Sequence, residues 1–239
     1  MNQNYKRFFS ETTHKRAVLS DGEHHHLAHV LRMRIGDRIV LFNGDDFDYH
    51  YQIDEIARDH TKLTLVEMVR NRVNPTIRVA VFVGLIRSDN LHIIVEKLNE
   101  IGATDLFLFT SNRTNVRTAS VNIEKLQSIA TQSCKQCGRS TPTTVHAPLT
   151  FDQMIQTLDG FQKVYYADRA EKRDKIQQRK MTTSESVALV IGPEGGMDMD
   201  ENLALAAVAE PVTLGPRTLR SETATIVATT IIMNKLGQL

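Results

Sequence analysis

From residue 79 onward, short apolar runs alternate with stretches of helical periodicity, and this alternation constrains the fold more than any other feature. Strands that are apolar along their whole length are buried on both faces, which is typical of parallel sheets covered by helices. Strands are expected at Val79–Ile86, Leu106–Phe109, Lys163–Ala167, Val187–Ile191 and Val212–Leu214, and helices at Leu91–Ile101, Ile123–Cys137, Met199–Val208 and Ala224–Leu236. The pattern predicts an α/β domain with a mainly parallel sheet and right-handed crossovers.

The first 70 or so residues differ, because short strand-like runs surround one brief helix. Helical spacing covers Glu23–Arg32, and strand-like runs cover Arg38–Phe42, Gln52–Ile56 and Lys62–Val69. This pattern indicates a small β-barrel. Charge, asparagine and proline interrupt the periodicity at Arg70–Pro75, where a linker is expected. We therefore predict two domains, at residues 1–72 and 73–239.

Length and cysteine usage exclude several classes of protein. No apolar run in the 239 residues approaches the roughly 20 that cross a bilayer, and residues 1–7 lack the apolar stretch of a secretory signal. A cytoplasmic protein with no membrane partner is expected. Cys134 and Cys137 form a single Cys-x-x-Cys, which could be a redox pair or half of a zinc site. A second pair of zinc ligands is missing from the sequence, so two free thiols and no metal site are the preferred interpretation.

The distribution of charge says more than its total, since a net charge of +1 implies no general attraction to nucleic acid. Residues 1–42 carry Lys6, Arg7, Lys15, Arg16, Arg32, Arg34 and Arg38 against Glu11, Asp21, Glu23 and Asp37. Two interpretations remain open at this point. The region is either a solvated surface of mixed charge or a patch that faces the phosphates of a nucleic acid.

Two segments rich in glycine and proline follow predicted strands near the C-terminus. They are residues 191–196, IGPEGG, and residues 214–224, LGPRTLRSETA. Ligands of parallel sheets lie beyond the carboxyl ends of the strands, which is where both segments fall. The first lacks the Lys-Ser/Thr of a phosphate-binding loop and is not Gly-x-Gly-x-x-Gly, which argues against ATP and dinucleotides. A pocket with few charges suits a ligand that is part apolar and part heterocycle.

Three polar residues of the second segment have competing interpretations. Ser221 could cap the last helix with Glu222 in its first turn, which would give both a structural role. Arg220 has no role in core packing and could pair with a phosphate or a developing anionic carbonyl. Arg217 could have the same functional role as Arg220 or could simply be a solvated surface residue, and the surface interpretation is preferred.

The two segments resemble the cofactor-binding motifs of the SPOUT class of S-adenosylmethionine-dependent RNA methyltransferases, and in particular of the 16S ribosomal RNA (uridine-N3)-methyltransferases. The resemblance extends along most of the chain, through His26-Leu27, Val30–Arg32, Gly36-Asp37, Glu96-Lys97, Glu100–Gly102, Ser111, Arg113, Gln136–Arg139 and Pro142. Some positions depart from the family pattern. Asn112 and Lys135 stand where glutamate is frequent, and the Arg87–Asn90 turn replaces a more basic turn that contains glycine.

The resemblance implies a fold and an assembly that the periodicity alone does not. It implies a PUA-like barrel that binds RNA, followed by a SPOUT-type α/β domain whose chain forms a C-terminal trefoil knot. Periodicity alone would predict an unknotted sheet. It also implies a homodimer in which the partner completes each site.

The same resemblance implies a cofactor, a substrate and their contact residues. The cofactor is S-adenosyl-L-methionine, and the substrate is 16S rRNA within the small ribosomal subunit. The implied cofactor contacts are Val190, Ile191, Gly192, Pro193, Glu194, Gly195, Leu214, Gly215, Leu219, Arg220, Ser221, Glu222, Thr223 and Ala224. The implied RNA contacts are Lys6, Arg7, Arg32, Arg34, Arg87, Arg113 and Arg139.

The expected reaction is transfer of a methyl group to N3 of a uridine. Arg220 is the preferred electrostatic catalyst, because loss of the N3 proton spreads negative charge onto the uracil oxygens. Glu222 is a second candidate catalytic residue as the proton acceptor, with helix capping as the competing role. Two other functions remain open. The chain could be a non-catalytic RNA-binding factor in ribosome assembly that retains the fold, or a related methyltransferase that acts on tRNA or on a ribose hydroxyl.

Overall fold

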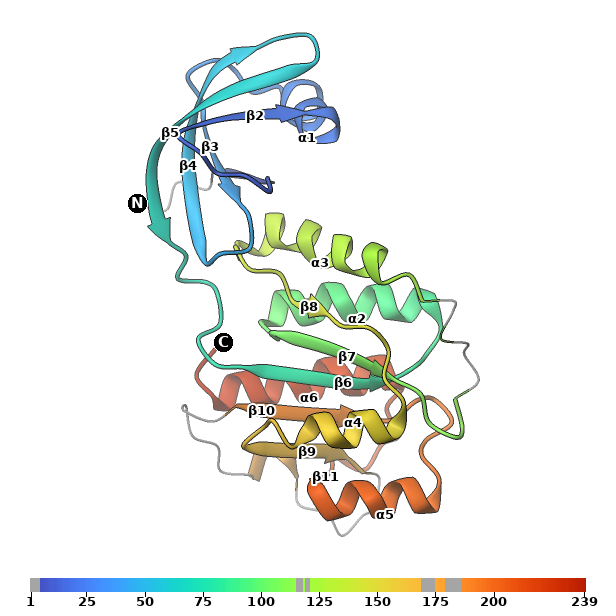
Figure 1. Cartoon of the computed structure of the whole chain (residues 1–239). Helices are drawn as coiled ribbons and strands as arrows, with labels where there is room; N and C mark the ends of the chain where they lie inside the picture. The colour runs from blue at the N-terminus through green and yellow to red at the C-terminus, as the bar shows by residue number, and fades with distance from the viewer. Residues whose placement is uncertain (1–4, 115–117, 119–120, 169–174, 179–185) are drawn as a thin grey trace. The chain divides into compact units, whose positions relative to one another are not determined.

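The computed structural model describes residues 5–114, 118, 121–168, 175–178 and 186–239. These residues form two compact units. The N-terminal unit contains Met1–Asn74 and Thr131–Pro142, and the C-terminal unit contains Pro75–Ala130 and Thr143–Leu239 (Figure 1). The predicted domain boundary between residues 72 and 73 stays a prediction. The sequence pattern did not indicate that residues 131–142 group with the N-terminal unit.

The N-terminal unit is built on a five-stranded sheet in the order β1-β3-β4-β5-β2. Its strands are β1 (Lys6–Phe9), β2 (Arg16–Ser20), β3 (Arg38–Phe42), β4 (Phe47–Ile56) and β5 (His60–Arg70). The β1 and β3 strands are parallel, and the other pairs are antiparallel. Register shifts between His50 and Tyr51 and between Ile53 and Glu55 bend β4. The sheet encloses its own core, which includes Phe8, Leu27 and Tyr51.

A short helix, α1 (Asp21–His25), continues into a π-helical turn, η1 (His26–Val30), in this unit. The predicted helix over Glu23–Arg32 is therefore displaced toward the N-terminus. Arg32 cannot extend it because its φ of 53° is left-handed, and Arg34 and Asp37 form the turn that leads into β3.

A polar network explains why residues 131–142 belong to the N-terminal unit. Asp48 on β4 accepts hydrogen bonds from the Arg7 guanidinium at 2.7 and 2.9 Å and from Asn71 Nδ2 at 3.0 Å. The Ser140 hydroxyl also donates to Asp48. Burial by itself raises the pKa of Asp48, but the hydrogen bonds from Arg7, Ser140 and Asn71 outweigh it and hold that pKa below its usual value.

The C-terminal unit contains a six-stranded sheet in the order β11-β9-β10-β6-β7-β8, and every neighbouring pair in it is parallel. Its strands are β6 (Val79–Gly84), β7 (Asp105–Phe109), β8 (Thr144–Val145), β9 (Lys163–Ala167), β10 (Val187–Ile191) and β11 (Glu210–Val212). The predicted parallel α/β sheet is confirmed. The expected strand at Val79–Ile86 ends two residues early, at Gly84.

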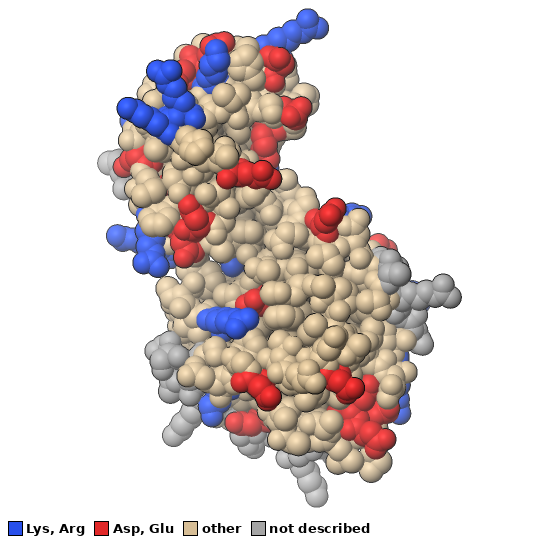
Figure 2. All heavy atoms as spheres, viewed as in Figure 1, with Lys and Arg blue, Asp and Glu red and all other residues tan. Residues whose placement is uncertain are grey.

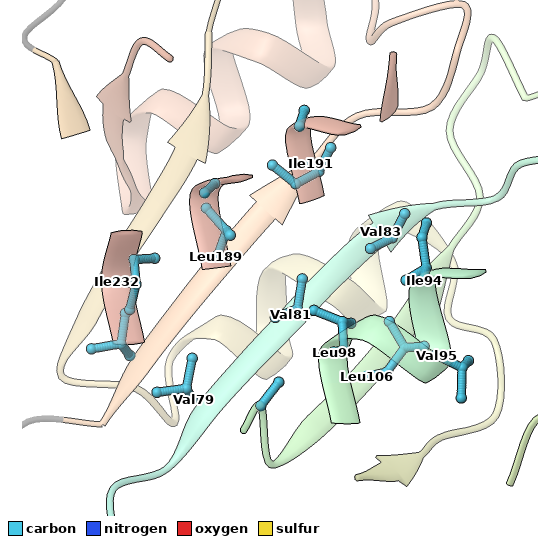
Figure 3. Packing of buried hydrophobic residues seen from close by; sticks show 14 of the residues in the cluster. Val79, Val81, Val83, Ile94, Val95, Leu98, Leu106, Leu189, Ile191 and Ile232 are labelled. Carbon is cyan, nitrogen blue, oxygen red and sulfur yellow. The ribbon is translucent and has the colours of Figure 1, made fainter. Parts of the chain in front are cut away.

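Helices bury both faces of this sheet. They are α2 (Ser88–Ile101), α3 (Ile123–Cys137), α4 (Phe151–Leu158), α5 (Met199–Val208) and α6 (Ser221–Lys235), with a 3-10 turn, η3, at Ile176–Gln178. Along β6, alternate residues enter different cores. Val81 packs with residues of α2 and α6, whereas Phe82 packs with residues of α4 and α5. Figure 3 shows the first of these cores, where Val81, Leu98 and Leu106 point toward one another.

Several elements were missed or shifted in the sequence analysis. The missed elements are β1, β2, β8, α4 and η3, which are short. The last helix begins at Ser221 rather than Ala224, because the extended backbone of Arg220 provides its N-cap. The predicted trefoil knot depends on the path of the chain through its C-terminal third, where residues 169–174 and 179–185 lie outside the described part. It stays a prediction.

A charged cluster lies where β6 and β7 begin, at the opposite edge of the sheet from the glycine-rich segments. The Asp105 carboxylate accepts from Thr104 Oγ1 at 2.8 Å and Arg78 Nε at 3.2 Å, and it lies 2.8 Å from His146 Nε2. Burial raises the pKa of Asp105, but the hydrogen bonds from His146, Arg78 and Thr104 outweigh it and lower that pKa to about 2.

The low pKa of Asp105 predicts how the free energy of unfolding depends on pH in acid. A carboxyl whose folded pKa lies below its unfolded value stabilises the fold above the unfolded pKa, near 3.9. That stabilisation, of about 2 kcal/mol for a shift of this size, is lost as the pH falls through about 2. We expect Asp105→Asn to lower the free energy of unfolding by about this amount at pH 7 and to flatten its fall between pH 4 and 2. Urea titrations across that range measure both effects, with the exposed Asp159→Asn as the control. An unchanged pH profile would show that the cluster contributes nothing.

Candidate active site

A pocket of about 350 Å³ lies at the carboxyl ends of β9, β10 and β11. The two segments rich in glycine and proline form most of its wall, together with residues that follow β7 and β9. Apolar side chains such as Leu214 and Leu219 share the wall with polar groups such as Asp168 and Arg113. The pocket therefore has the mixed lining expected of a small-molecule site.

The first segment lies directly against the end of β6. A Cβ atom at Gly84 would be 2.4 Å from both N and Cδ of Pro193, which is too short for any real contact. Glycine is therefore required at position 84 for the segment to occupy its place. Gly192 and Pro193 both line the pocket, so this close packing on β6 fixes part of its wall.

A hydrogen bond joins the two segments. The Ser221 hydroxyl donates to the Gly192 carbonyl oxygen at 2.9 Å, and Ser221 is buried. The interpretation of Ser221 as the cap of the last helix is wrong: Arg220 is the N-cap residue, and no side chain caps this helix. Ser221 instead joins two walls of the pocket, which lie 29 residues apart in the sequence.

The backbone conformation at position 215 requires a glycine. Its φ is 120°, a conformation that side-chain-bearing residues rarely adopt, and Thr213 Oγ1 accepts from its N–H at 3.3 Å. The turn follows β11, and Leu214 and Leu219 on its two sides both line the pocket.

Most of the predicted cofactor contacts line this pocket, but not all. Those that do are Ile191, Gly192, Pro193, Glu194, Gly195, Leu214, Gly215, Leu219, Ser221 and Ala224, and Arg217 joins them. Val190 instead packs in the core between β10 and the helices α4 and α5. Arg220, Glu222 and Thr223 lie at the start of α6 outside the lining. Their contacts with a cofactor stay predictions.

The start of α6 gives the two candidate catalytic residues different environments. Arg220 is exposed and therefore accessible to a large substrate. Glu222 lies in the first turn of the helix, where the helix dipole favours an anion. Its Oε2 is buried and has no hydrogen-bond partner within the described part of the chain.

The predicted RNA contacts divide into two groups. Lys6, Arg32, Arg34, Arg87 and Arg113 are exposed, and in the face that Figure 2 shows, basic and acidic side chains are interspersed on the N-terminal unit. Arg7 instead pairs with Asp48, and Arg139 is 2% exposed. Contact with RNA stays a prediction for these two, and their geometry gives them a structural role in the N-terminal unit.

Sequence reasoning missed several residues of the pocket wall, among them Asp168, Met197, Asn202 and Thr213. Asp168 directly follows β9, and its backbone N–H donates to the Val212 carbonyl oxygen at 2.9 Å. The rule that ligands lie beyond the carboxyl ends of parallel strands could have found it. Arg113 was predicted as an RNA contact and in the structure lines the pocket.

Other features of the described residues bear on the class of site. Cys134 and Cys137 are not joined in a disulfide. In the part of the chain that the structure describes, no cluster of three or more histidine, cysteine or acidic side chains is suited to a metal ion. Over the same residues, no helix combines the length and apolar character needed to span a membrane.

A pocket at the carboxyl ends of parallel strands, lined by two segments rich in glycine and proline, is typical of an α/β protein that binds a small ligand beyond its strands. Comparison with known families is more specific. Residues 72–233 match the family of the RNA methyltransferase domain, and residues 19–66 match that of the RNA methyltransferase PUA domain. Because the first match covers more than half of the chain, this protein belongs to the RNA methyltransferase domain family. The predicted PUA-like character of the N-terminal unit is confirmed as well.

Individual relatives agree along nearly the whole chain. The ribosomal RNA small subunit methyltransferase E of Bacillus subtilis is 28% identical over 245 residues, which cover 95% of each chain. The protein of the same name from Rickettsia conorii is 27% identical over 215 residues, covering 88% of this chain and 86% of that one. A crystal structure of ribosomal RNA small subunit methyltransferase E from Neisseria gonorrhoeae bound to S-adenosyl methionine has a TM-score of 0.84 at 23% identity, covering 96% of this chain and 97% of that one. That last likeness concerns the fold.

Proposed function

We propose that this protein is an S-adenosylmethionine-dependent methyltransferase that modifies N3 of a specific uridine in 16S rRNA of the small ribosomal subunit. The observation that carries the proposal is that the segments 191–196 and 214–224 line one and the same pocket, in a chain that also has a PUA-like unit. The names of the relatives support an rRNA substrate. The choice of N3 and of the uridine comes from the motif resemblance.

The pocket suits S-adenosylmethionine in size and in chemistry. A volume of about 350 Å³ falls within the range of small-ligand sites. Backbone groups of Gly192 to Gly195 and of Gly215 would hold the polar parts, and Leu214 and Leu219 would pack on the adenine. When bound, the cofactor supplies a methyl group that its sulfonium has already activated. The protein must then align the uridine and stabilise its anionic form.

In our proposal, Arg220 and Glu222 act on the uracil. Loss of the N3 proton spreads charge onto O2 and O4, and the Arg220 guanidinium stabilises that charge. Glu222 accepts the proton directly or through a water molecule. Its Oε2 accepts no hydrogen bond from a described residue, so this role would break none. The target base must also leave its stack to reach the pocket.

The N-terminal unit would hold the surrounding RNA through its phosphates. Arg32 and Arg34 are exposed in the loop between η1 and β3, beside the exposed Val30 and Ile35. We expect the double variant Arg32→Glu/Arg34→Glu to weaken RNA binding and to reduce the slope of log affinity against log salt by about 1 to 2, since each lost phosphate contact removes about 0.7 to 0.9. Filter binding over a range of salt concentrations measures the slope.

A matched variant controls for the change in net charge. Arg58→Glu/Lys62→Glu reverses two exposed charges of the β4–β5 hairpin and should leave the slope near that of the wild-type protein. Equal slopes in wild-type protein and in the Arg32/Arg34 variant would remove this loop from the RNA contact.

We also propose a homodimer, on the character of α6. Between Glu222 and Lys235 this helix has no charged residue, yet Thr223 and Thr230 are exposed and Val227 and Ile231 are half-buried. A second copy of the chain would cover this uncharged surface. Sedimentation equilibrium tests the assembly, and a monomer at micromolar concentration would contradict it.

The cytoplasmic location stays a prediction.

Two measurements test the proposed function. Calorimetric titration with S-adenosylmethionine should show binding, and mass spectrometry of rRNA nucleosides should show that 3-methyluridine is lost from 16S rRNA when the gene is deleted. Binding of RNA without binding of the cofactor would favour a non-catalytic assembly factor. A methylated nucleoside missing from tRNA, or a missing ribose methylation, would favour another methyltransferase of the same class.

A further inference from the structure

Two hydrogen bonds join the loop after β7 to the start of α5, and two more connect the residues of α5 that accept them. Glu201, which is 5% exposed, accepts from the Asn112 N–H through Oε1 at 2.7 Å and from the Asp198 N–H through Oε2 at 2.9 Å. Asp198 accepts from the Glu201 N–H through Oδ1 at 2.9 Å and from Asn112 Nδ2 through Oδ2 at 2.7 Å. We call this set of three residues the 112–198–201 clamp.

The clamp does more than cap a helix. Asp198 and Glu201 form a capping box at the start of α5, which requires only the two bonds between them. The second oxygen of each carboxylate accepts a hydrogen bond from Asn112, which lies 86 residues away from Asp198 in the sequence. The bond from the Glu201 N–H and that from the Asn112 side chain keep the pKa of Asp198 below its usual value, so its carboxylate accepts both as an anion near neutral pH.

The residue that the clamp places is Arg113. Arg113 follows Asn112 and is one of the residues that line the pocket. Its carbonyl oxygen would lie 2.9 Å from a Cβ atom at Gly195, so the loop is packed on the glycine segment itself. Bonds within the loop fix its shape, since Thr114 donates to the Ser111 carbonyl oxygen at 2.9 Å and Ser111 N–H donates to Thr114 Oγ1 at 2.8 Å.

We propose that Asp198 and Glu201 are positioning residues which, through Asn112, hold Arg113 at the pocket wall, where its guanidinium binds the target nucleotide of the RNA. The inference depends on the proposed function for the identity of the substrate. The juxtaposition of the clamp, Arg113 and Gly195 does not depend on it. Asparagine suits position 112 because the contact with Asp198 needs a donor, which a glutamate there could not provide.

Exchanging the amide and the carboxylate between positions 112 and 198 tests the clamp. Asn112→Asp places two carboxylates against each other, and we expect single-turnover methylation to fall about tenfold or more, as for loss of a hydrogen bond to a charged group. Adding Asp198→Asn restores a donor and an acceptor, and Asn is as good an N-cap as Asp. The double variant should return to within about threefold of the wild-type rate. Asp198→Asn alone should lose about threefold at most, because the Asn112 amide can turn to accept the bond.

Two further readouts separate positioning from folding and from cofactor binding. Amide hydrogen exchange of residues 110–114, measured without RNA, should be faster in Asn112→Asp and normal in the double variant. The dissociation constant for S-adenosylmethionine should change less than the methylation rate. Asp200→Asn, which changes an exposed side chain between Asp198 and Glu201 in the sequence, is the control for charge.

Each outcome decides the proposal. A double variant as slow as Asn112→Asp would overturn the clamp, because the charge at position 112 would then be the cause. A cofactor affinity that falls as much as the rate would place Arg113 on the cofactor and overturn its role toward RNA. Absence of methylation and of cofactor binding in wild-type protein would contradict the proposed function, while the exchange pattern would still confirm or refute the clamp.

Discussion

Gly84→Ala is expected to abolish most cofactor binding while leaving the protein folded at low temperature. The added methyl group would lie 2.4 Å from two backbone-linked atoms of Pro193, so the first pocket segment has to move away from β6. Overpacking of this kind costs about 1 to 3 kcal/mol. If binding has to restore the original position, affinity for S-adenosylmethionine falls about 5- to 150-fold. Calorimetric titration measures the loss.

A second glycine provides the control. A Cβ atom at Gly160 would lie 3.5 Å from the Thr157 carbonyl oxygen, which is an ordinary contact. Gly160→Ala should therefore bind the cofactor as the wild-type protein does, and thermal melting of both variants reports their stability. Unaltered binding in Gly84→Ala would show that the contact between β6 and Pro193 does not determine the shape of the pocket.

Arg220→Ala is expected to lower single-turnover methylation more than tenfold with little change in cofactor affinity. Arg220 is exposed at the N-cap of α6 and lies outside the pocket lining, so its loss leaves the cofactor contacts in place. In our proposal its guanidinium acts only on the uracil anion, and donors of this kind are worth about 10²- to 10³-fold in rate. Rapid-quench assays with enzyme and cofactor in excess over the RNA measure the chemical step.

Arg220→Lys separates charge from geometry. A lysine keeps the positive charge but lacks the planar fork of the guanidinium, so its rate should lie between those of Arg220→Ala and the wild-type protein. An unchanged rate in Arg220→Ala would remove this residue from the mechanism. A loss of cofactor affinity equal to the loss of rate would instead assign Arg220 to the cofactor site.

The parallel sheet could be predicted because its strands are apolar along their length. Val187–Ile191 and Lys163–Ala167 were predicted with the bounds that the structure has, since both faces of these strands are buried and the signal is continuous. In the N-terminal unit, β2 alternates between buried and exposed residues over only five positions. So short an alternation is hard to distinguish from a loop.

The pocket was predictable only in part, for a similar reason. Its two segments are local in sequence and carry glycine and proline where the backbone turns sharply, so they could be recognised. The contacts that join them are not local. The bond from Ser221 to Gly192 and the packing of Gly84 on Pro193 each join residues far apart in the chain, and single-residue preferences carry no signal for either. For Ser221 the local rule of helix capping pointed to the wrong role.

The membership of residues 131–142 in the N-terminal unit limits how this protein can be divided. The helix α3 begins in one unit and ends in the other, so a chain cut at the linker near residue 74 separates Asp48 from Ser140. The isolated first segment would bury a carboxylate with one of its donors missing, which destabilises a fold. The two units are therefore interleaved in sequence, and an exchange of RNA-binding modules between such enzymes would have to transfer two pieces of chain together.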